Sequence, residues 1–580
     1  MAAKEQQSAG KRRFLEPLQG AWRYLAVTGG VFLVAAMIGA RLVELHVLDQ
    51  EFLRSQGEQR TLRTEPIDAN RGVIRDRNGE PLAVSTPVET LWANPSTLPA
   101  DHPRIGELAG LLDRDPDELR ERLARNQDRQ FLYLRRKVQP SLAEQVLDLD
   151  VPGVHSRREY RRYYPAREVA SHVIGFTNID ESGQEGMELS FDHWLSGEKG
   201  SKRVLRDNRG RTVRDIGLLK EAKPGNDLQL SLDLRLQYLA YRELKAAVEA
   251  HDARGGTIVM LDTRNGEILA MANQPSFNPN DRDQFDPARL RNRAITDLFE
   301  PGSTIKPFSA AAALESGEFQ PDTRVNTSPG YRRMGDYTIR DNHDYGTLSL
   351  AEIVTHSSNV GISKVASALS GERLQDLFYR VGFGQSTGIG FPGEAVGILP
   401  ANVNWRPVEV AALSYGYGMS VNALQLAQAY MVLANGGTHY PVSLLKNEEA
   451  PRGRRVMASQ TAAKIRRMLV SVVEEGTGTR AASDIYRLAG KTGTVHLVGS
   501  SGYEKDQYKA LFAGMGPAAD PRIVTVVTVD APARSEYYGG EVAAPVFGRV
   551  MSDALRLLNV EPSGKPEMAD GSAVQQGGQG

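Results

Sequence analysis

A long apolar run near the N-terminus is the first pattern in the chain. It covers residues 24–40 and continues to Leu45 if the side chain of Arg41 extends toward the membrane surface. This length is at the short end of what a helix needs to cross a bilayer. Five basic residues precede the run, which favours a cytoplasmic N-terminus. We therefore expect a cytoplasmic segment over residues 1–23, a single transmembrane anchor over residues 24–45 and an exported remainder.

The same run also permits interpretation as a signal peptide that is cleaved. Gly39 and Ala40 are small enough for a cleavage site, but the match to the A-x-A pattern is poor and the run is long for a signal peptide. We therefore favour the uncleaved anchor. Under both interpretations most of the chain is exported.

Beyond the anchor, the pattern of apolar and polar positions divides the chain into two further regions. Residues 50–225 mix charged helical stretches with short strand and turn signals, among them the turn pair Asn78-Gly79. A linker surrounds Pro224, and residues 230–250 after it have helical periodicity. We predict an N-terminal domain over residues 50–225 and the start of a second domain at residue 226.

Strand patterns occur at both ends of this second domain. Residues 255–272 alternate as two strands around a turn at residues 264–266, and residues 522–532 form a late strand of the same character. Strands at both ends with helices between them predict one α/β sheet domain over residues 226–560. Gly, Gln, Ser and Pro dominate residues 561–580, which predicts a disordered tail.

Composition narrows the classes of function. The chain has 580 residues, of which 41% are apolar, so it can bury more than one core. Its 70 basic and 71 acidic residues leave a net charge of −1, so no electrostatic footprint for nucleic acid stands out. The chain has no cysteine, which excludes disulfides, a cysteine nucleophile and cysteine-based metal sites. We expect neither a metal nor a cofactor.

Ser303 and Lys306 form the first candidate catalytic pair. They lie directly before a helical run that starts at Pro307. Residues three positions apart at a helix start share a face, so the lysine can reach the hydroxyl. The helix N-terminus also favours negative charge that develops on the serine oxygen. The bare S-x-x-K pattern is weak, however, because three other serines have a lysine three positions later: Ser8, Ser196 and Ser443.

The sequence Lys491-Thr492-Gly493-Thr494 is the sharper signal. It contains the only K-[ST]-G pattern in the chain and lies in a strand-like segment. A small glycine beside a cation on a strand lets a substrate backbone approach closely and offers charge to a carboxylate.

A third pattern, S-x-N, occurs at three places in the chain. Ser357-Ser358-Asn359 is one candidate, and the triplets that start at Ser276 and Ser420 match equally well. The order of the motifs eliminates Ser276, because it precedes Ser303. Ser357 and Ser420 both remain on this evidence.

Several other patterns carry no comparable weight. Residues 384–388 fit G-x-S-x-G, but glycine and proline follow where that motif needs a helix. A phosphate loop ending at Lys491 would require glycine at position 485, where the chain has Ile485. His356 and His496 lie beside the motifs, and we interpret them as polar neighbours without a catalytic role.

Taken together in this order, S-x-x-K, S-x-N and K-T-G resemble the motifs of the penicillin-recognising serine enzymes. Further segments, among them residues 71–85, 299–307, 414–430 and 511–527, resemble division-specific class B penicillin-binding proteins. The resemblance extends over about residues 20–560 and assigns the S-x-N role to Ser357. It implies a β-lactamase-like α/β transpeptidase domain with sheet and helices, on an extended N-terminal pedestal. It further implies one helix in the inner membrane and a periplasmic catalytic domain.

The resemblance implies a peptidoglycan D,D-transpeptidase that acts in septal synthesis. Ser303 would attack the penultimate carbonyl of a stem peptide ending in D-Ala-D-Ala, and Lys306, as a free amine, would take the proton. Ser357, helped by Lys491, would relay that proton to the leaving amine. An amine of a neighbouring stem peptide would then resolve the acyl-enzyme. Substrate binding is implied for the remaining residues: Asn359, Thr492, Gly493, Thr494, Tyr508, Tyr537 and Tyr538.

Two other classes of function remain as alternatives. A serine β-lactamase or D,D-carboxypeptidase would use the same motifs and give the acyl group to water. A penicillin-binding sensor or scaffold would keep Ser303 without turnover. The anchor and pedestal favour the transpeptidase. For it, the resemblance implies β-lactams as covalent inhibitors, and an FtsW-like glycosyltransferase and other division proteins as partners.

Overall fold

The computed structural model describes most of the chain, and all statements below concern its described residues. The predicted cytoplasmic segment lies outside them up to residue 15, and the predicted tail lies outside them from residue 564. The described ranges are 16–48, 62–206, 212–402, 404–449, 451–499, 502–534 and 536–563.

A long N-terminal helix coincides with the predicted anchor. Helix α1 spans Glu16–Val43, and a π-helical turn, η1, follows over Glu44–Leu48. The stretch Trp22–His46 is long and apolar enough to cross a membrane, because about 20 helical residues span the hydrocarbon core. Its apolar side chains are exposed; Phe32, for example, is 77% exposed. The helix therefore has the properties of an anchor.

Beyond the anchor the chain forms two compact units and passes between them several times. Unit 1 comprises Met1–Asp68, Glu89–Glu159 and Lys199–Lys223, and unit 2 comprises the remaining residues. Residues 69–88 and 160–198 thus pack with the C-terminal part, although they precede residue 226. The limits of 50–225 and 226–560 stay a prediction.

Unit 1 contains one antiparallel sheet of three strands and part of a second, five-stranded sheet. Strands β1 (Leu62–Ile67), β6 (Gly200–Arg206) and β7 (Thr212–Lys220) form one of them. The end of β3 (Pro81–Ala93) pairs with β4 (Leu132–Val138), and β5 (Val154–Tyr163) also pairs with β3. A small core forms among these strands and helices α3 (Ile105–Leu111), α4 (Pro116–Arg125) and α5 (Pro140–Leu147); it includes Leu91, Leu108, Leu123, Leu134 and Val146.

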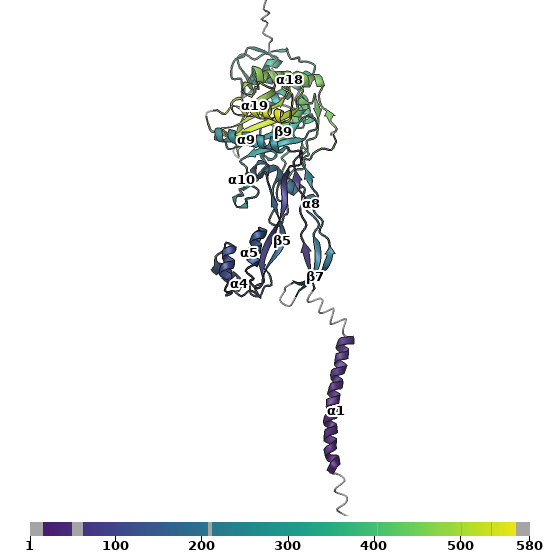
Figure 1. Cartoon of the computed structure of the whole chain (residues 1–580). Coiled ribbons are helices and arrows are strands. Elements are labelled where there is room, and N and C mark those ends of the chain that lie inside the picture. The colour runs from purple at the N-terminus through teal and green to yellow at the C-terminus, as the bar shows by residue number, and fades with distance from the viewer. Residues whose placement is uncertain are drawn as a thin grey trace, which may run out of the picture. The chain divides into compact units, whose positions relative to one another are not determined.

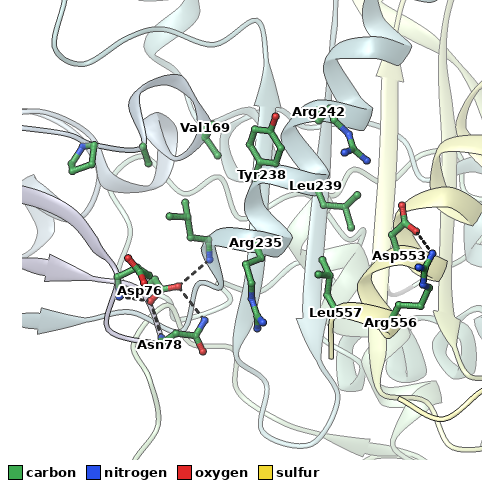
Figure 2. A pocket seen from close by; sticks show the side chains of 14 residues that line it. Asp76, Asn78, Val169, Arg235, Tyr238, Leu239, Arg242, Asp553, Arg556 and Leu557 are labelled. Carbon is green, nitrogen blue, oxygen red and sulfur yellow. Dashed lines mark hydrogen bonds and ion pairs between the residues drawn. The ribbon is translucent and has the colours of Figure 1, made fainter. Parts of the chain in front are cut away.

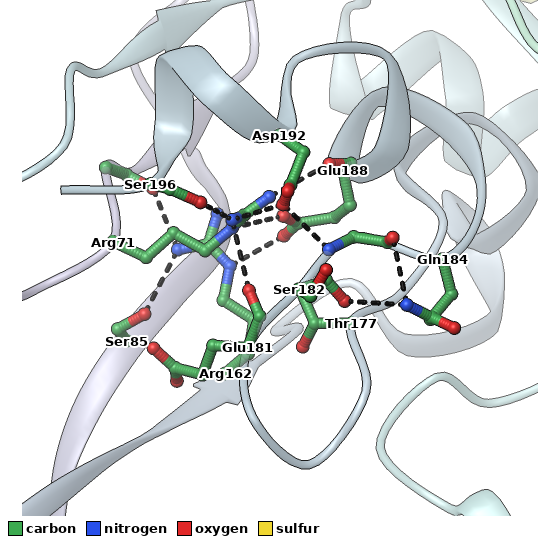
Figure 3. Close-up of polar contacts among 12 residues, drawn as sticks. Arg71, Ser85, Arg162, Thr177, Glu181, Ser182, Gln184, Glu188, Asp192 and Ser196 are labelled. Atoms are coloured by element: carbon green, nitrogen blue, oxygen red, sulfur yellow. Dashed lines mark hydrogen bonds and ion pairs between the residues drawn. The ribbon is translucent and has the colours of Figure 1, made fainter.

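A buried cluster of charged side chains joins the N-terminal segments of unit 2 (Figure 3). Glu188 accepts a hydrogen bond from Arg71 Nε over 2.7 Å and another from Arg162 Nε over 2.6 Å. Arg71 also donates to Asp192 and Ser196, over 2.8 Å each. Buried charges persist only when they are paired and hydrogen-bonded. The stability of this part of unit 2 therefore depends on every charged side chain of the cluster keeping its partner.

A five-stranded antiparallel sheet forms the centre of unit 2, with the strand order β10-β9-β19-β18-β17. The N-terminal strand β9 pairs directly with the late strand β19, and β17 lies at an edge. The predicted sheet of distant segments is thereby confirmed. The strand bounds are β9 Gly255–Asp262, β10 Ile268–Gln274, β17 Ala489–Gly499, β18 Gly502–Gly516 and β19 Ile523–Asp530.

Helices cover both faces of this sheet (Figure 1), which explains why β9, β10 and β19 are buried along their whole length. On one face α9 (Leu234–Ala250) and α19 (Gly539–Leu557) share a core that includes Leu244 and Phe547. The predicted helix over residues 230–250 is thus confirmed, with Asp233 as its N-cap. The other face carries α12 (Lys306–Glu315), α17 (Ala423–Ala434) and α18 (Ser459–Glu474).

Shorter elements complete unit 2. Its remaining strands are β2 (Ile74–Arg75), β8 (Leu228–Gln229), β11 (Arg324–Asn326), β12 (Tyr331–Met334), β13 (Tyr337–Arg340), β14 (Thr347–Ser349), β15 (Thr438–His439) and β16 (Arg454–Arg455). Its remaining α-helices are α6 (Ser171–Ile174), α7 (Gly186–Ser190), α8 (Asp192–Leu195), α10 (Pro287–Leu290), α11 (Arg293–Thr296), α13 (Leu350–Thr355), α14 (Asn359–Ala368), α15 (Gly371–Arg380) and α16 (Pro407–Ser414).

Candidate active site

Ser303 lies in a 3-10 turn, η4 (Gly302–Ile305), immediately before α12. Its side chain is half-buried, whereas Lys306 at the start of α12 is completely buried. Gly302 has a φ of +53°, and a Cβ there would lie 2.4 Å from Val495 Cγ1 on β17. Only glycine fits such a position. The turn that carries Ser303 is therefore held close against the strand that carries the K-T-G motif.

The amine of Lys306 connects the first two motifs. Its Nζ lies 3.0 Å from Ser357 Oγ, 2.5 Å from the carbonyl oxygen of Ser357 and 2.7 Å from Asn359 Oδ1. Ser420 instead forms an isolated backbone bridge with Ile398. The geometry thus agrees with the assignment of S-x-N to Ser357.

Both lysines of the motifs have perturbed pKa values. Burial lowers the pKa of Lys306 well below its usual range, the charge of Lys491 lowers it further, and the carboxylate of Asp341 opposes both effects. Burial lowers the pKa of Lys491 to about 7. Removal from water disfavours an ammonium ion. Lys306 is therefore suited to be a free amine that accepts a proton, and Lys491 changes its charge near neutral pH.

The S-x-N motif forms a strained turn between α13 and α14. Ser357 has a φ of +61°, in the left-handed region that side chains rarely adopt. Ser358 caps α14, because its Oγ accepts a hydrogen bond from Gly361 N over 2.8 Å. Asp341, from a separate loop, accepts hydrogen bonds from Ser358 Oγ, Asn359 N and Val360 N over 2.5, 2.5 and 3.0 Å. The side chains of Asp341 and Ser358 thus hold this turn through hydrogen bonds.

The K-T-G motif lies on β17, as predicted. Lys491 Nζ lies 3.3 Å from Thr492 Oγ1, and the latter is 2.7 Å from Thr477 Oγ1. Thr494 Oγ1 accepts a hydrogen bond from Gly539 N over 2.9 Å. Because that oxygen accepts from the backbone, its own proton is available to an anion.

The motifs line one cavity of about 770 Å³. Lys306 and Lys491 are not among its lining residues. Those that line it and that the sequence singled out for a role are Ser303, Ser357, Asn359, Thr492, Gly493, Thr494 and Tyr538. Further lining residues lacked such a signal, among them Asp341, His343, Tyr345, Thr477, Arg480 and Glu541. The hydroxyl of Thr477 and the carboxylate of Asp341 reach the motifs from distant parts of the chain, so neither spacing nor local pattern indicates them.

The three predicted wall tyrosines form a row of rings. The ring centroids of Tyr508 and Tyr537 are 4.3 Å apart, and those of Tyr537 and Tyr538 are 4.4 Å apart. A hydrogen bond with Tyr538 raises the pKa of Tyr537 to about 12. Of the three, Tyr538 lines the cavity. The ring of His496 packs at a tilt against Tyr508, with centroids 4.5 Å apart, and His356 stacks on Tyr345 at 5.4 Å. Both histidines therefore have packing partners.

A larger cavity, of about 1240 Å³, lies elsewhere in unit 2 between α9 and the end of α19 (Figure 2). Its apolar lining includes Tyr238 and Leu557. Its arginines have acidic partners, since Arg235 pairs with Asp233 and Arg556 with Asp553. Among the described residues no serine lines it, so it lacks the candidate nucleophile that lines the smaller cavity.

Two protein families match this chain, one in its C-terminal region and one in its N-terminal region. Residues 256–552 match the family "Penicillin binding protein transpeptidase domain", and residues 66–230 match the "Penicillin-binding Protein dimerisation domain". The chain is 43% identical to the probable peptidoglycan D,D-transpeptidase PbpC of Pseudomonas aeruginosa, with 95% of this chain and 98% of the relative covered. It is 41% identical to the peptidoglycan D,D-transpeptidase FtsI of Escherichia coli K12, with 93% and 92% covered.

Solved structures support the same relationship. Penicillin binding protein 3 of Mycobacterium tuberculosis, in complex with aztreonam, is 28% identical with a TM-score of 0.67, and the match covers 87% of this chain and 98% of that structure. The transpeptidase domain of Burkholderia pseudomallei penicillin-binding protein 3 is 40% identical with a TM-score of 0.54, covering 58% and 98%. The predicted fold is thereby confirmed, and the chain belongs to the FtsI-type class B penicillin-binding proteins, a family of peptidoglycan D,D-transpeptidases.

Proposed function

We propose that this chain cross-links peptidoglycan stem peptides through an acyl-enzyme on Ser303. We further propose a septal role, anchorage by α1 in the inner membrane and a periplasmic catalytic unit. The observation that carries the mechanism is the buried amine of Lys306 within hydrogen-bond distance of Ser357 Oγ and Asn359 Oδ1. Burial and the charge of Lys491 lower the pKa of Lys306 well below its usual range, which supports a free amine that can take a proton.

Acylation begins when Ser303 Oγ attacks the penultimate carbonyl carbon of a stem peptide ending in D-Ala-D-Ala. Lys306 takes the hydroxyl proton as general base. Backbone N–H groups of Ser303 and Thr494 stabilise the oxyanion, a device worth about 3 kcal/mol per donor. Ser357 passes the proton to the leaving nitrogen, the peptide bond breaks, and D-Ala departs.

The donor peptide binds along β17. This strand is at the sheet edge, and an edge strand can pair with an extended peptide through its backbone. The hydroxyls of Thr492 and Thr494 hold the terminal carboxylate, and protonated Lys491 supplies the opposite charge. Asn359 binds the donor's peptide amide, and the tyrosine row forms a wall of the site.

The acyl-enzyme is resolved by an amine of a neighbouring stem peptide. That amine attacks the ester carbonyl, the bond between the acyl carbon and Ser303 Oγ breaks as the new amide bond forms, and the proton that the amine loses passes to Ser303 Oγ. A β-lactam acylates Ser303 in the same way, but its leaving group stays attached and blocks the acceptor. Glycan strands are supplied by a separate glycosyltransferase of the FtsW type.

Intact-mass spectrometry with labelled penicillin, followed by peptide mapping, tests this function. We expect one stable adduct per chain at Ser303, and a cross-linked product when a D-Ala-D-Ala donor and an amine acceptor are supplied together. Rapid release of hydrolysed penicillin would indicate the β-lactamase alternative. A stable adduct without any turnover of donor and acceptor would indicate a sensor or scaffold.

A further inference from the structure

Asp341 occupies a position that the proposed reaction does not yet use. It follows β13 directly, lines the cavity of the motifs and accepts three hydrogen bonds from the S-x-N segment. Resting on the proposed function, we propose that Asp341 is a positioning residue for acylation: its carboxylate holds the Ser357–Asn359 turn so that both side chains meet the Lys306 amine.

The first step of the argument is the start of α14. A helix leaves its first backbone N–H groups without intrahelical partners. Ser358 caps the N–H of Gly361, whereas Asp341 Oδ1 accepts from the N–H groups of Asn359 and Val360. Its Oδ2 accepts from the Ser358 hydroxyl itself. The carboxylate therefore completes the cap from outside the helix and fixes the residue that caps it.

The second step is the strain next to this cap. Ser357 has a φ of +61°, and a side-chain-bearing residue keeps such a conformation only where its surroundings enforce it. Ser357 lies between α13 and the capped start of α14, and its Oγ and carbonyl oxygen both contact Lys306 Nζ. Release of the cap would let the turn relax and move both oxygens away from the amine.

The third step is charge. Two ionisable groups act on Lys306 from elements packed near it: Lys491 on β17 and Asp341 after β13. The turn between α13 and α14 contains His356 and the uncharged Ser357, and α14 begins with the uncharged Asn359. His356 is not among the groups that act on Lys306. Burial and Lys491 favour the free amine, whereas Asp341 favours the ammonium ion. Removal of the negative charge should therefore lower the pKa of Lys306, and this readout separates Asp341 from a purely structural cap.

The same loop supplies a matched control. Asp344 Oδ1 accepts hydrogen bonds from Ser328 Oγ and Gly346 N, over 3.0 Å each. It thus caps a loop as Asp341 does, but it does not line the cavity of the motifs. Asp344→Asn removes one loop carboxylate without touching the S-x-N turn.

The experiment measures the second-order rate of acylation by a fluorescent penicillin in the detergent-solubilised full chain, from about pH 5 to 9. Asp341→Asn keeps an oxygen that can accept from the two backbone N–H groups but loses the charge. We expect its acid limb to move to lower pH, while Asp344→Asn keeps the wild-type profile. Asp341→Ala loses the contacts as well, and its rate should fall by about 10²-fold at every pH, as for a misplaced catalytic group.

An unshifted acid limb in Asp341→Asn would overturn the proposal, as would a wild-type rate in a folded Asp341→Ala. If Asp341→Ala does not fold, the profile of Asp341→Asn decides alone. The wild-type protein distinguishes this failure from failure of the proposed function. A wild type that forms no Ser303 adduct refutes the function, whereas a reactive wild type with an unshifted Asp341→Asn refutes only the positioning role.

Discussion

The hydroxyl of Tyr503 donates a hydrogen bond to Glu300 Oε2 over 2.9 Å and so joins the start of β18 to the loop that precedes Ser303. Glu300 Oε1 accepts a second hydrogen bond from Gly418 N over 3.0 Å. Two distant segments therefore meet at one carboxylate, three residues before the proposed nucleophile.

Tyr503→Phe removes one of these bonds and leaves the other. A single hydrogen bond to a charged group contributes about 1.5–3 kcal/mol to stability. Because Tyr503 is 57% exposed, we expect the variant to lose stability at the low end of this range. Acylation by penicillin should slow several-fold. Glu300→Ala, which loses both bonds, should slow it more. A wild-type rate in Tyr503→Phe would show that the Tyr503 contact does not order the loop.

Ser303→Ala should abolish covalent labelling by penicillin, because a methyl group cannot attack a carbonyl. Ser420→Ala is the matched control, since Ser420 belongs to the competing S-x-N pattern and does not line the cavity of the motifs. It should label like the wild type. Gel fluorescence and peptide mapping check both, and labelling that persists in Ser303→Ala would assign the nucleophile to another residue.

Lys306→Arg should lower the acylation rate by about 10²–10⁴-fold, the usual contribution of a general base. Arginine stays protonated and therefore cannot take the proton. Rapid-mixing kinetics with penicillin measure this. A variant with a near-normal rate would limit Lys306 to a structural role.

The acylation rate should depend on pH with two limbs. It rises with pH as Lys306 loses its proton, at a pKa that burial lowers well below the usual range. It falls above a pH of about 7, because Lys491 then loses the proton whose charge holds the donor carboxylate. In Lys491→Arg the alkaline limb should move to higher pH. A wild-type rate that stays level above neutral pH would contradict the charge assigned to Lys491.

Glu188→Gln should destabilise unit 2 by about 3–5 kcal/mol, because two buried arginines would lose their shared counter-charge. Urea denaturation gives the free energy of unfolding. Glu121→Gln is the control, since Glu121 pairs with Arg125 on the surface and such pairs contribute about 0–1 kcal/mol. Similar losses in the two variants would mean that the buried cluster is not a stability determinant.

The elements with local signatures could be predicted from the sequence. The turn at residues 264–266 separates β9 from β10, as the alternation indicated. Ser303 lies in the turn directly before α12 and Lys306 is the first residue of that helix, where the following Pro307 is compatible with a helix start. These features depend on neighbours within a few residues, so the chain alone indicates them.

Features that depend on tertiary contacts could not be predicted in this way. Lysine is rarely buried, so nothing local indicates that Lys306 and Lys491 are removed from water. Asp341 caps a helix that starts 18 residues later in the chain, whereas capping signals in sequence are adjacent to the helix. Thr477, in the segment that follows α18, contacts Thr492 on β17 through the two hydroxyls. The residue-level roles stay predictions until the variants above are measured.

The position of β19 has a consequence for biogenesis. This strand lies between β9 and β18, so it is an interior strand of the catalytic sheet, although it is the last to be synthesised. Without residues 523–530 the sheet is divided into two separate hairpins. A chain that is synthesised from its N-terminus therefore lacks the strand that joins the two hairpins until residues 523–530 have been made. Fragments that end before β19 thus lack the continuous sheet that carries the K-T-G motif.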